Sequence, residues 1–144
     1  MQETAPLIAW DTKLETGIHV VDEEHKFLVQ NLNLLNQVVH QKGIAQELLD
    51  DDVRAVLNNL AHYTQTHFVV EEELMRVWQY PGFSQHQAEH NDFIRRVMSL
   101  TSAFADGGMD ISGTMLNYLR EWLTTHILGT DHAMGNFLKG KGQT

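Results

Sequence analysis

Four stretches of the chain repeat apolar residues at alternating intervals of four and three, and this spacing constrains the fold more than any other feature. Such a spacing turns one side of each helix toward its neighbours, as in left-handed helical bundles. Gly- or Pro-containing segments separate the stretches, and none of them alternates like a β-strand. The sequence therefore predicts an all-α fold, an up-down-up-down four-helix bundle with an irregular N-terminal arm.

The expected element boundaries follow from the residues that interrupt the apolar spacing. Asp22 is expected near the start of the first helix as a capping or first-turn acid, and Gly43 is expected to end that helix. Pro81-Gly82, Gly107-Gly108 and Gly129 are the expected stop signals of the other three. The expected helices span residues 22–43, 46–79, 84–105 and 111–128. The single expected domain, 1–144, comprises an arm over 1–18 pinned by Leu7, Ile8 and Trp10, a bundle over 19–129 and a short tail over 130–144.

Composition excludes several classes of protein. A length of 144 residues fits one domain, and a formal net charge of −9 argues against nucleic acid or an anionic membrane as a partner. The chain has no apolar run long enough to cross a bilayer, and its first residues lack the pattern of a signal peptide. Without cysteines it has no disulfides, thiolate–zinc sites or cysteine-ligated iron–sulfur clusters. We therefore expect a cytoplasmic monomer that inserts into no membrane.

Ionisable side chains interrupt the apolar positions near one end of the predicted bundle. Burying one such group without a partner costs several kcal/mol, so burying six calls for a shared partner. A lone histidine on an apolar face is usually a core residue, but alternating helices would bring all six to one level. Asp131 follows the fourth helix and is expected to return to that level through a flexible Gly129-Thr130 link. The six residues are His25, His67, Glu71, His86, His90 and His126.

Neighbouring polar residues serve as a comparison for this cluster. Four other histidines fall outside the apolar positions and are expected at the surface or in supporting roles: His19, His40, His62 and His132. Glu72 and Glu73 are expected on a solvated face, and Asp22-Glu23-Glu24 is expected to be a charge cluster favoured by the helix dipole. The in-register set of five histidines, Glu71 and Asp131 is what predicts a metal site.

The number of ligands indicates which metals would fit. Five imidazoles and two carboxylates are too many for one tetrahedral zinc ion. They suit two ions that accept imidazole and carboxylate together, with iron favoured over manganese or zinc. If two octahedral ions share both carboxylates and one oxo or hydroxo bridge, a single coordination position stays open. One open position favours a small diatomic ligand over a larger substrate.

Four sequence elements together resemble the signature of the hemerythrin family, in particular its bacteriohemerythrins. They are Gly17 to His25, His67 to Glu72, the pair His86 and His90, and His126 to Asp131. The resemblance covers essentially the whole chain, including the arm around Trp10-Asp11. It implies reversible dioxygen binding at two iron ions, one held by His86, His90 and His126 and the other by His25 and His67. Glu71, Asp131 and an oxo or hydroxo group would bridge them, and Phe68, Trp122, Leu123 and Ile127 resemble the lining of the oxygen pocket.

Several functions are compatible with such a site. An oxygen carrier or store, which could deliver oxygen to an oxygen-consuming enzyme through a transient contact, is the preferred hypothesis. An oxygen or redox sensor is the second, and a di-iron enzyme acting on peroxide, nitric oxide or oxygen is the third. The enzyme ranks lowest because no additional acid, base or tyrosine occupies a core position near the cluster. Ferritin-like iron storage is disfavoured because the chain has no Glu-x-x-His motif.

Overall fold

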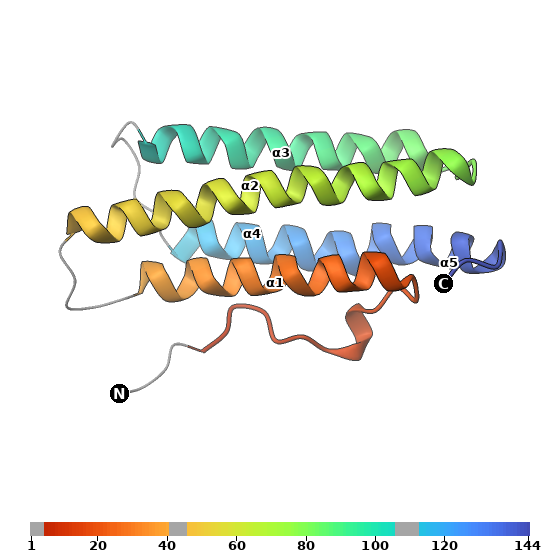
Figure 1. Ribbon diagram of the computed structural model, residues 1–144, viewed down its shortest axis with the longest axis horizontal. Helices are drawn as coiled ribbons and strands as arrows, with labels where there is room; N and C mark the ends of the chain where they lie inside the picture. The colour runs from red at the N-terminus through yellow and green to blue at the C-terminus, as the bar shows by residue number, and fades with distance from the viewer. Residues whose placement is uncertain (1–4, 41–45, 106–112) are drawn as a thin grey trace.

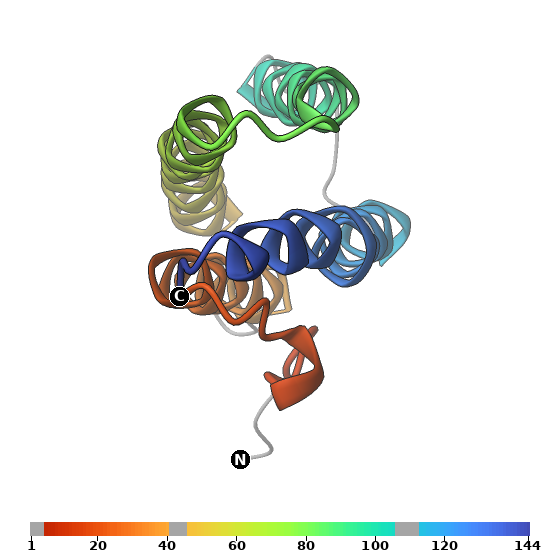
Figure 2. The same cartoon turned by 90° about the vertical axis from the view of Figure 1, so that its right-hand side faces the viewer.

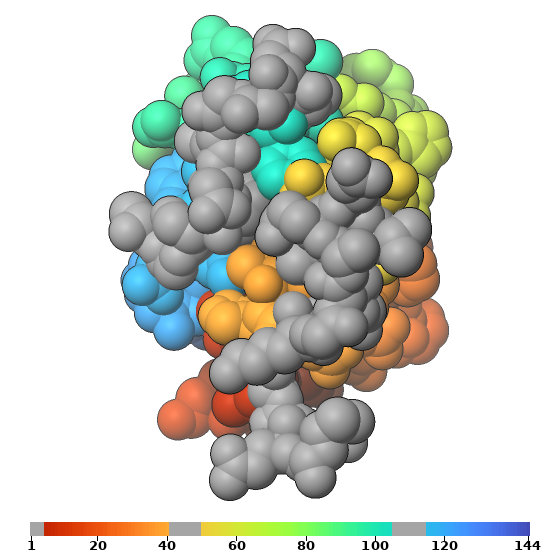
Figure 3. All heavy atoms as spheres, turned by 90° about the vertical axis from the view of Figure 1, so that its left-hand side faces the viewer, coloured from red at the N-terminus to blue at the C-terminus, as the bar shows by residue number. Residues whose placement is uncertain are grey.

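The computed structural model describes residues 5–40, 46–105 and 113–144, and these residues form the predicted all-α bundle. Successive long helices run antiparallel to one another (Figure 1). Figure 3 views the end where α1 finishes, α2 begins, α3 finishes and α4 begins. None of the helices in the described ranges is both long enough and apolar enough to cross a membrane. The four are α1 (His19–Val39), α2 (Gln46–Val77), α3 (Phe83–Ala105) and α4 (Gly113–Thr125).

The positions selected by the four-and-three spacing form the core, as predicted. The spacing fails at two helix ends. Val39 at the end of α1 is half-buried, and at the end of α2 Leu74 and Trp78 are half-buried while Met75 is fully buried instead. Met75 belongs to a second apolar cluster, with Ile18, Val21 and residues near the C-terminus, that closes this end of the bundle. The main core includes Leu28, Leu32, Leu35, Leu57, Leu60, Phe93, Val97, Leu116, Leu119 and Leu123.

The connection between α2 and α3 is a tight helix termination. Gln79 adopts a left-handed conformation with φ of 54°. The Tyr80 amide donates to the carbonyl of Met75 at 2.8 Å, and the Gln79 amide donates to that of Arg76 at 3.3 Å. These are the bonds of a Schellman motif, after which Pro81 prevents the helix from continuing. The other expected stop signals, Gly43 and Gly107-Gly108, and the expected start at Ile111 lie outside the described residues.

The arm is fastened to the bundle by side chains of α1. α1 begins at His19, three residues before Asp22, so Asp22 is the expected first-turn acid rather than the cap, and it is buried there. The Asp22 carboxylate accepts hydrogen bonds from the amide and hydroxyl of Thr16, both at 2.7 Å, and from the Gly17 amide at 3.1 Å. Asn33 pairs through its side chain with both backbone groups of Ile8 at 2.9 Å. Thr12–Leu14 form a short 3₁₀ helix, η1, within the arm.

The expectation that the fourth helix ends at Gly129 was wrong. A π-helical segment, η2 (His126–Asp131), follows α4 directly and leads into α5 (His132–Gly140). Figure 2 shows α5 crossing the end of the bundle toward α1. Met134 and Leu138 of α5 are fully buried in the second apolar cluster. Their burial outweighs the cost of about 1 kcal/mol for a glycine inside a helix, so tertiary packing overrides the local stop signal.

Gly135 allows α5 to lie directly against the arm, and replacing it should test this contact. A Cβ atom at this position would lie 2.7 Å from the Thr16 carbonyl oxygen, which belongs to the backbone and cannot move aside easily. We expect Gly135→Ala to lower the free energy of unfolding by about 1–3 kcal/mol. Gly140→Ala is the control, because its added Cβ meets no atom within 4 Å. Urea denaturation would reveal the difference, and equal midpoints for both variants would contradict the close approach.

Candidate metal centre

Seven ionisable side chains converge at one end of the bundle, and they are the seven that the sequence predicts. They come from every side of the bundle: α1 contributes one, while α2, α3 and η2 contribute two each. None is more than 3% exposed. Their nitrogen and oxygen atoms form two groups, within each of which all atoms lie within 4.8 Å of one another. One group contains Glu71, His86, His90, His126 and Asp131, and the other contains His25, His67, Glu71 and Asp131.

Glu71 divides its two oxygen atoms between two sets of histidines. Its Oε1 lies 2.9 Å from His90 Nε2 and 3.1 Å from His86 Nε2. Its Oε2 lies 3.0 Å from His67 Nε2 and 3.2 Å from His25 Nε2. A carboxylate that faces two nitrogen sets with different oxygens has the arrangement of a bridging ligand.

Asp131 makes the same division. Its Oδ1 lies 2.9 Å from His86 Nε2 and 3.1 Å from His126 Nε2, whereas its Oδ2 lies 2.9 Å from His25 Nε2. In both carboxylates, one oxygen faces members of the set His86, His90 and His126, and the other oxygen faces members of the set His25 and His67.

Several of these buried atoms have no hydrogen-bond partner, which indicates that they face a common point instead. Both carboxylate oxygens of Asp131 and the Nε2 atom of His67 are unpartnered despite their short distances to other ligand atoms. The Nε2 atoms of His90 and His126 face each other at 3.1 Å. Buried polar atoms are nearly always satisfied in proteins, so such a convergence of lone pairs fits metal ions. Two ions, one for each group, match this donor set.

The π-helical geometry of η2 explains how His126 and Asp131 both point inward. In an α-helix, residues five apart are rotated by about 140° about the axis, so one of the two would face away. The i→i+5 bonding of a π-helix places such residues nearly one above the other. The flexible Gly129-Thr130 link predicted from the sequence is therefore wrong, since both residues belong to a helical turn.

Three glutamates hold the outer nitrogen of three histidines. Glu24 of α1 lies 2.9 Å from His67 Nδ1 of α2, and Glu72 of α2 lies 2.9 Å from His90 Nδ1 of α3. Glu89 of α3 lies 3.2 Å from His126 Nδ1. A carboxylate near Nδ1 accepts a hydrogen bond from the Nδ1–H group and so leaves the lone pair of Nε2 free to bind a metal.

These glutamates were missed by sequence reasoning, which placed Glu72 on a solvated face and Glu24 in a charge cluster favoured by the helix dipole. Each is adjacent in the sequence to one of the seven residues, as in Glu24-His25, Glu71-Glu72 and Glu89-His90. Adjacent residues on a helix are rotated by about 100°, so the side chain beside an inward-facing ligand points toward the neighbouring helix. A glutamate next to a predicted ligand is the signal that could have identified them.

The charges of the cluster shift the pKa values of its members strongly. Burial alone would lower the pKa of His67 and of His126, but the nearby carboxylates, chiefly Glu71 and Asp131 respectively, raise each to about 10. Burial would raise the pKa of Glu71, yet the positive charge of His67 and the nearby imidazoles of His25 and His126 hold it well below the usual range. In the absence of metal, protons on the imidazoles therefore supply the positive charge that the two buried carboxylates require.

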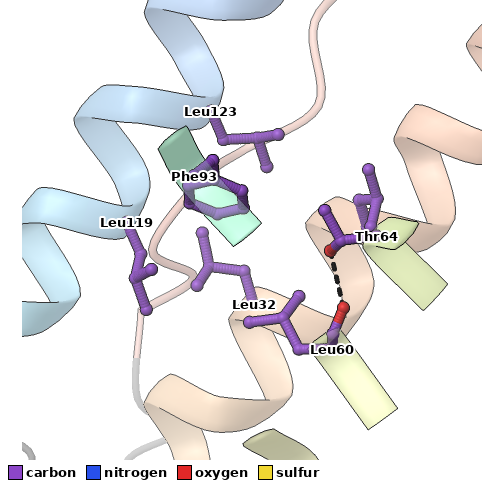
Figure 4. A pocket seen from close by; sticks show the side chains of 7 residues that line it. Leu32, Leu60, Thr64, Phe93, Leu119 and Leu123 are labelled. Atoms are coloured by element: carbon purple, nitrogen blue, oxygen red, sulfur yellow. Dashed lines mark hydrogen bonds between the residues drawn. The ribbon is translucent and has the colours of Figure 1, made fainter. Parts of the chain in front are cut away.

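An apolar cavity of about 10 Å³ lies one helical turn from the cluster (Figure 4). Leu28 and Phe93 each follow a ligand by three residues, and Thr64 and Leu123 each precede one by three. The Thr64 hydroxyl donates to the Leu60 carbonyl at 2.6 Å, so it presents no free donor. The cavity can admit only a very small molecule.

The predicted oxygen-pocket residues occupy three kinds of position. Of the four, only Leu123 lines the cavity. Phe68 stacks on His90, with ring centroids 3.7 Å apart, and Trp122 stacks on His126 at 4.5 Å. Ile127 is buried in the main core. Phe68 and Trp122 thus fix the orientation of two imidazoles rather than enclosing the cavity.

The remaining histidines and one tyrosine complete the surroundings. His19, His40 and His62 are exposed and His132 is half-buried, in agreement with their expected surface or supporting roles. Tyr80, which sequence reasoning did not place near the site, lines a groove together with His86. Burial and the charge of Asp131 raise the pKa of its phenol, which shows that it lies close to the cluster.

Comparisons with known proteins agree with this site. Residues 16–138 match the family model described as the hemerythrin HHE cation binding domain. A bacteriohemerythrin from Stenotrophomonas maltophilia is 35% identical over 135 residues, which cover 92% of this chain and 82% of that protein. A hemerythrin from Themiste dyscrita is 30% identical over 122 residues, covering 85% and 86%. A crystal structure of wild-type hemerythrin superimposes with a TM-score of 0.83 at 25% identity, covering 92% of this chain and 98% of that one.

Proposed function

The chain belongs to the hemerythrin family, and from this premise we propose that it binds dioxygen reversibly at a non-haem pair of iron ions. The observation that carries the proposal is the division of the Glu71 and Asp131 oxygens between two sets of histidines. His86, His90 and His126 would hold one iron, and His25 and His67 the other. Glu71 and Asp131 would bridge them together with an oxo or hydroxo group. When bound, the iron pair supplies the electrons and the open coordination position that dioxygen requires.

The chain's own residues favour reversible binding over chemical conversion of the ligand. The cavity beside the site is walled by apolar side chains, which exclude water and anions that would displace bound oxygen. Among the described residues that line it, Thr64 is the polar one, and its hydroxyl is already bonded to the backbone. Glu24, Glu72 and Glu89 are each engaged with an imidazole on the outer side. No proton donor therefore faces the cavity from this set of residues.

We accordingly favour oxygen transport, storage or delivery to an oxygen-consuming enzyme over an enzymatic role. A sensor acting through a partner, or an enzyme acting on peroxide or nitric oxide, is the alternative. We place the protein in the cytoplasm as a monomer whose contact with an oxygen-consuming enzyme is transient.

The proposal is tested by exposing the reduced, iron-loaded protein first to air and then to vacuum. A carrier should show a charge-transfer absorption band that appears in air and disappears under vacuum over repeated cycles, with two irons per chain. Irreversible bleaching accompanied by peroxide release would indicate an oxidase instead.

Glu72 should strengthen metal binding through His90, although it lies outside the ligand set. Replacing it in Glu72→Ala removes the acceptor at 2.9 Å from His90 Nδ1, so we expect the affinity for iron to fall by about 10–100-fold. Glu73→Ala is a matched control, because the neighbouring Glu73 is exposed and forms an ion pair with Arg76 on the surface of the same helix. Competition with a chelator gives both affinities, and equal values would rule out the supporting role of Glu72.

A further inference from the structure

Two grooves lie along the seam between α3 and the segment formed by α4 and η2, beside the metal centre. The larger has a volume of about 320 Å³ and reaches His86, Gly129 and Ala133, whereas the smaller, of about 290 Å³, reaches His126. Both are lined by Glu89 and Thr125, which therefore lie where the two grooves meet. Thr125, Gly129 and Ala133 are exposed, so the larger groove opens to solvent.

An ion that binds at this centre must pass through a wall of protein, because the seven ligands are almost completely buried. The cavity on the inner side is lined by leucines, Phe93 and a Thr64 whose hydroxyl is occupied. Moving a hydrated divalent ion through such an apolar wall is strongly unfavourable, because the ion would lose its water without gaining ligands. Passage through the bundle core is therefore unfavourable, and a polar path is required.

The seam offers that polar path, since the grooves reach two ligands of the three-histidine set. His86 lines the larger groove, and its Nδ1 atom has no partner, while its Nε2 atom faces Glu71 and Asp131. His126 lines the smaller groove. The imidazole rings of His86 and His126 thus lie between the solvent-facing grooves and the metal centre.

The Glu89 side chain is partly exposed to solvent and also contacts one of the metal ligands. Its side chain is 35% exposed, yet its Oε1 lies 3.2 Å from His126 Nδ1 and accepts a hydrogen bond from the Thr130 hydroxyl at 2.8 Å. A carboxylate, together with the Thr125 hydroxyl and the Gln85 amide along the larger groove, provides oxygen ligands that can replace the water of a divalent ion.

We propose that this seam is the route by which ferrous iron enters the metal centre. Glu89 takes the ion from water, and the ion then passes between the His86 and His126 rings to the buried carboxylates. The inference rests on the proposed function, because it assumes that iron is the ion held at the end of the route. It assigns Glu89 a role in the rate of loading in addition to its support of His126.

The test measures how fast the metal-free protein takes up ferrous iron without oxygen. Quenching of tryptophan fluorescence reports the rate, since Trp122 stacks on His126, and iron analysis after desalting reports final occupancy. Gly129→Leu and Ala133→Leu place a bulky side chain in the larger groove, and the first does so without a clash because an added Cβ meets nothing within 4 Å. We expect both to slow loading at least several-fold with unchanged final iron content. Gly140→Leu is the control, because its Cβ is equally unobstructed and it lines neither groove.

A second pair of variants tests Glu89 itself. Glu89→Gln should slow loading several-fold, whereas Glu73→Gln should not, because Glu73 is exposed, pairs with Arg76 and lines neither groove. Gly129→Leu could lower the final iron content by disturbing η2. In that case the rate at which Ala133→Leu takes up iron decides whether the larger groove is the route. Loading rates equal to that of the unaltered protein in Ala133→Leu and Glu89→Gln would overturn the route while leaving the iron site intact. Failure of the unaltered protein to bind iron at equilibrium would instead overturn the proposed function.

Discussion

Replacing His126 with leucine should abolish normal iron loading of this protein. His126 is the only histidine that η2 contributes, and its Nε2 atom lies 3.1 Å from Asp131 Oδ1 and 4.0 Å from Glu71 Oε1. Leucine offers no ligand atom, and it also leaves the buried carboxylates with one cationic partner fewer. We expect iron content to fall from two per chain to one or none, with loss of the oxygen-dependent absorption band.

His40→Leu provides the control for this change. His40 is exposed at the end of α1, and its Nδ1 atom lies 2.8 Å from the Asn36 carbonyl oxygen. This variant should keep full iron content. Circular dichroism of both proteins would show whether the bundle remains folded, so that loss of iron can be assigned to the ligand. Equal iron content in folded His126→Leu and His40→Leu would refute the assignment.

Six of the seven candidate ligands could be predicted from helix periodicity, whereas Asp131 lies outside that spacing. His67 and Glu71 continue an apolar spacing that Val53, Leu57 and Leu60 begin, so any fold that buries those leucines also buries the two ligands. The same holds for His86 and His90 in front of Phe93. Burial of ionisable groups at core positions is costly, and this cost is what makes the pattern informative about metal binding.

Features that depend on contacts between helices could not be predicted in the same way. The choice of Gly129 as a helix end follows correct local chemistry, but Met134 and Leu138 gain more by packing onto Met75 and Val21 than the glycine costs. Asp22 is the first-turn acid that the sequence allowed, but its contact with the arm at Thr16 depends on tertiary packing that the local sequence does not specify. At Gly129, tertiary burial outweighs a local preference worth about 1 kcal/mol.

The π-helical turn η2 is another feature that sequence reasoning did not predict. A five-residue interval between His126 and Asp131 is incompatible with a shared face on an α-helix, so sequence reasoning required a loop to bring Asp131 back. The turn meets the same requirement while keeping the backbone hydrogen-bonded, which a buried loop would not do as well. An interval of five between two strongly predicted ligands could therefore be used to predict a π-helical turn.

The metal-free protein should lose stability as the pH rises from neutral to alkaline values. The pKa of His67 and that of His126 are raised from 6.5 to about 10 in the folded state. A group whose pKa is raised on folding stabilises the protein fully below its unfolded value and loses that contribution as the pH passes the folded value. Deprotonation of these imidazoles leaves the buried Glu71 and Asp131 charges unpaired, which costs several kcal/mol.

The metal-free protein should also lose stability at acidic pH, and there the cause is protonation of the two carboxylates. The pKa values of Glu71 and Asp131 are lowered from 4.5 and 3.8, so their contribution is present above those values and is lost as the pH falls further. The melting temperature of the metal-free protein should therefore be highest between about pH 4.5 and 6.5 and decline toward pH 10. His126→Leu should show a smaller decline on the alkaline side, because one of the titrating imidazoles is gone.

Iron should reverse this alkaline decline, because the ion and the protons compete for the same nitrogen atoms. Metal binding requires neutral imidazoles, so the affinity for iron increases with pH over the range in which the metal-free protein weakens. The difference in melting temperature between iron-loaded and metal-free protein should consequently widen from pH 6.5 toward pH 10. Thermal unfolding followed by circular dichroism under anaerobic conditions measures both curves. Parallel curves across this range would mean that protons do not occupy the place of the metal, and the electrostatic account of the site would be wrong.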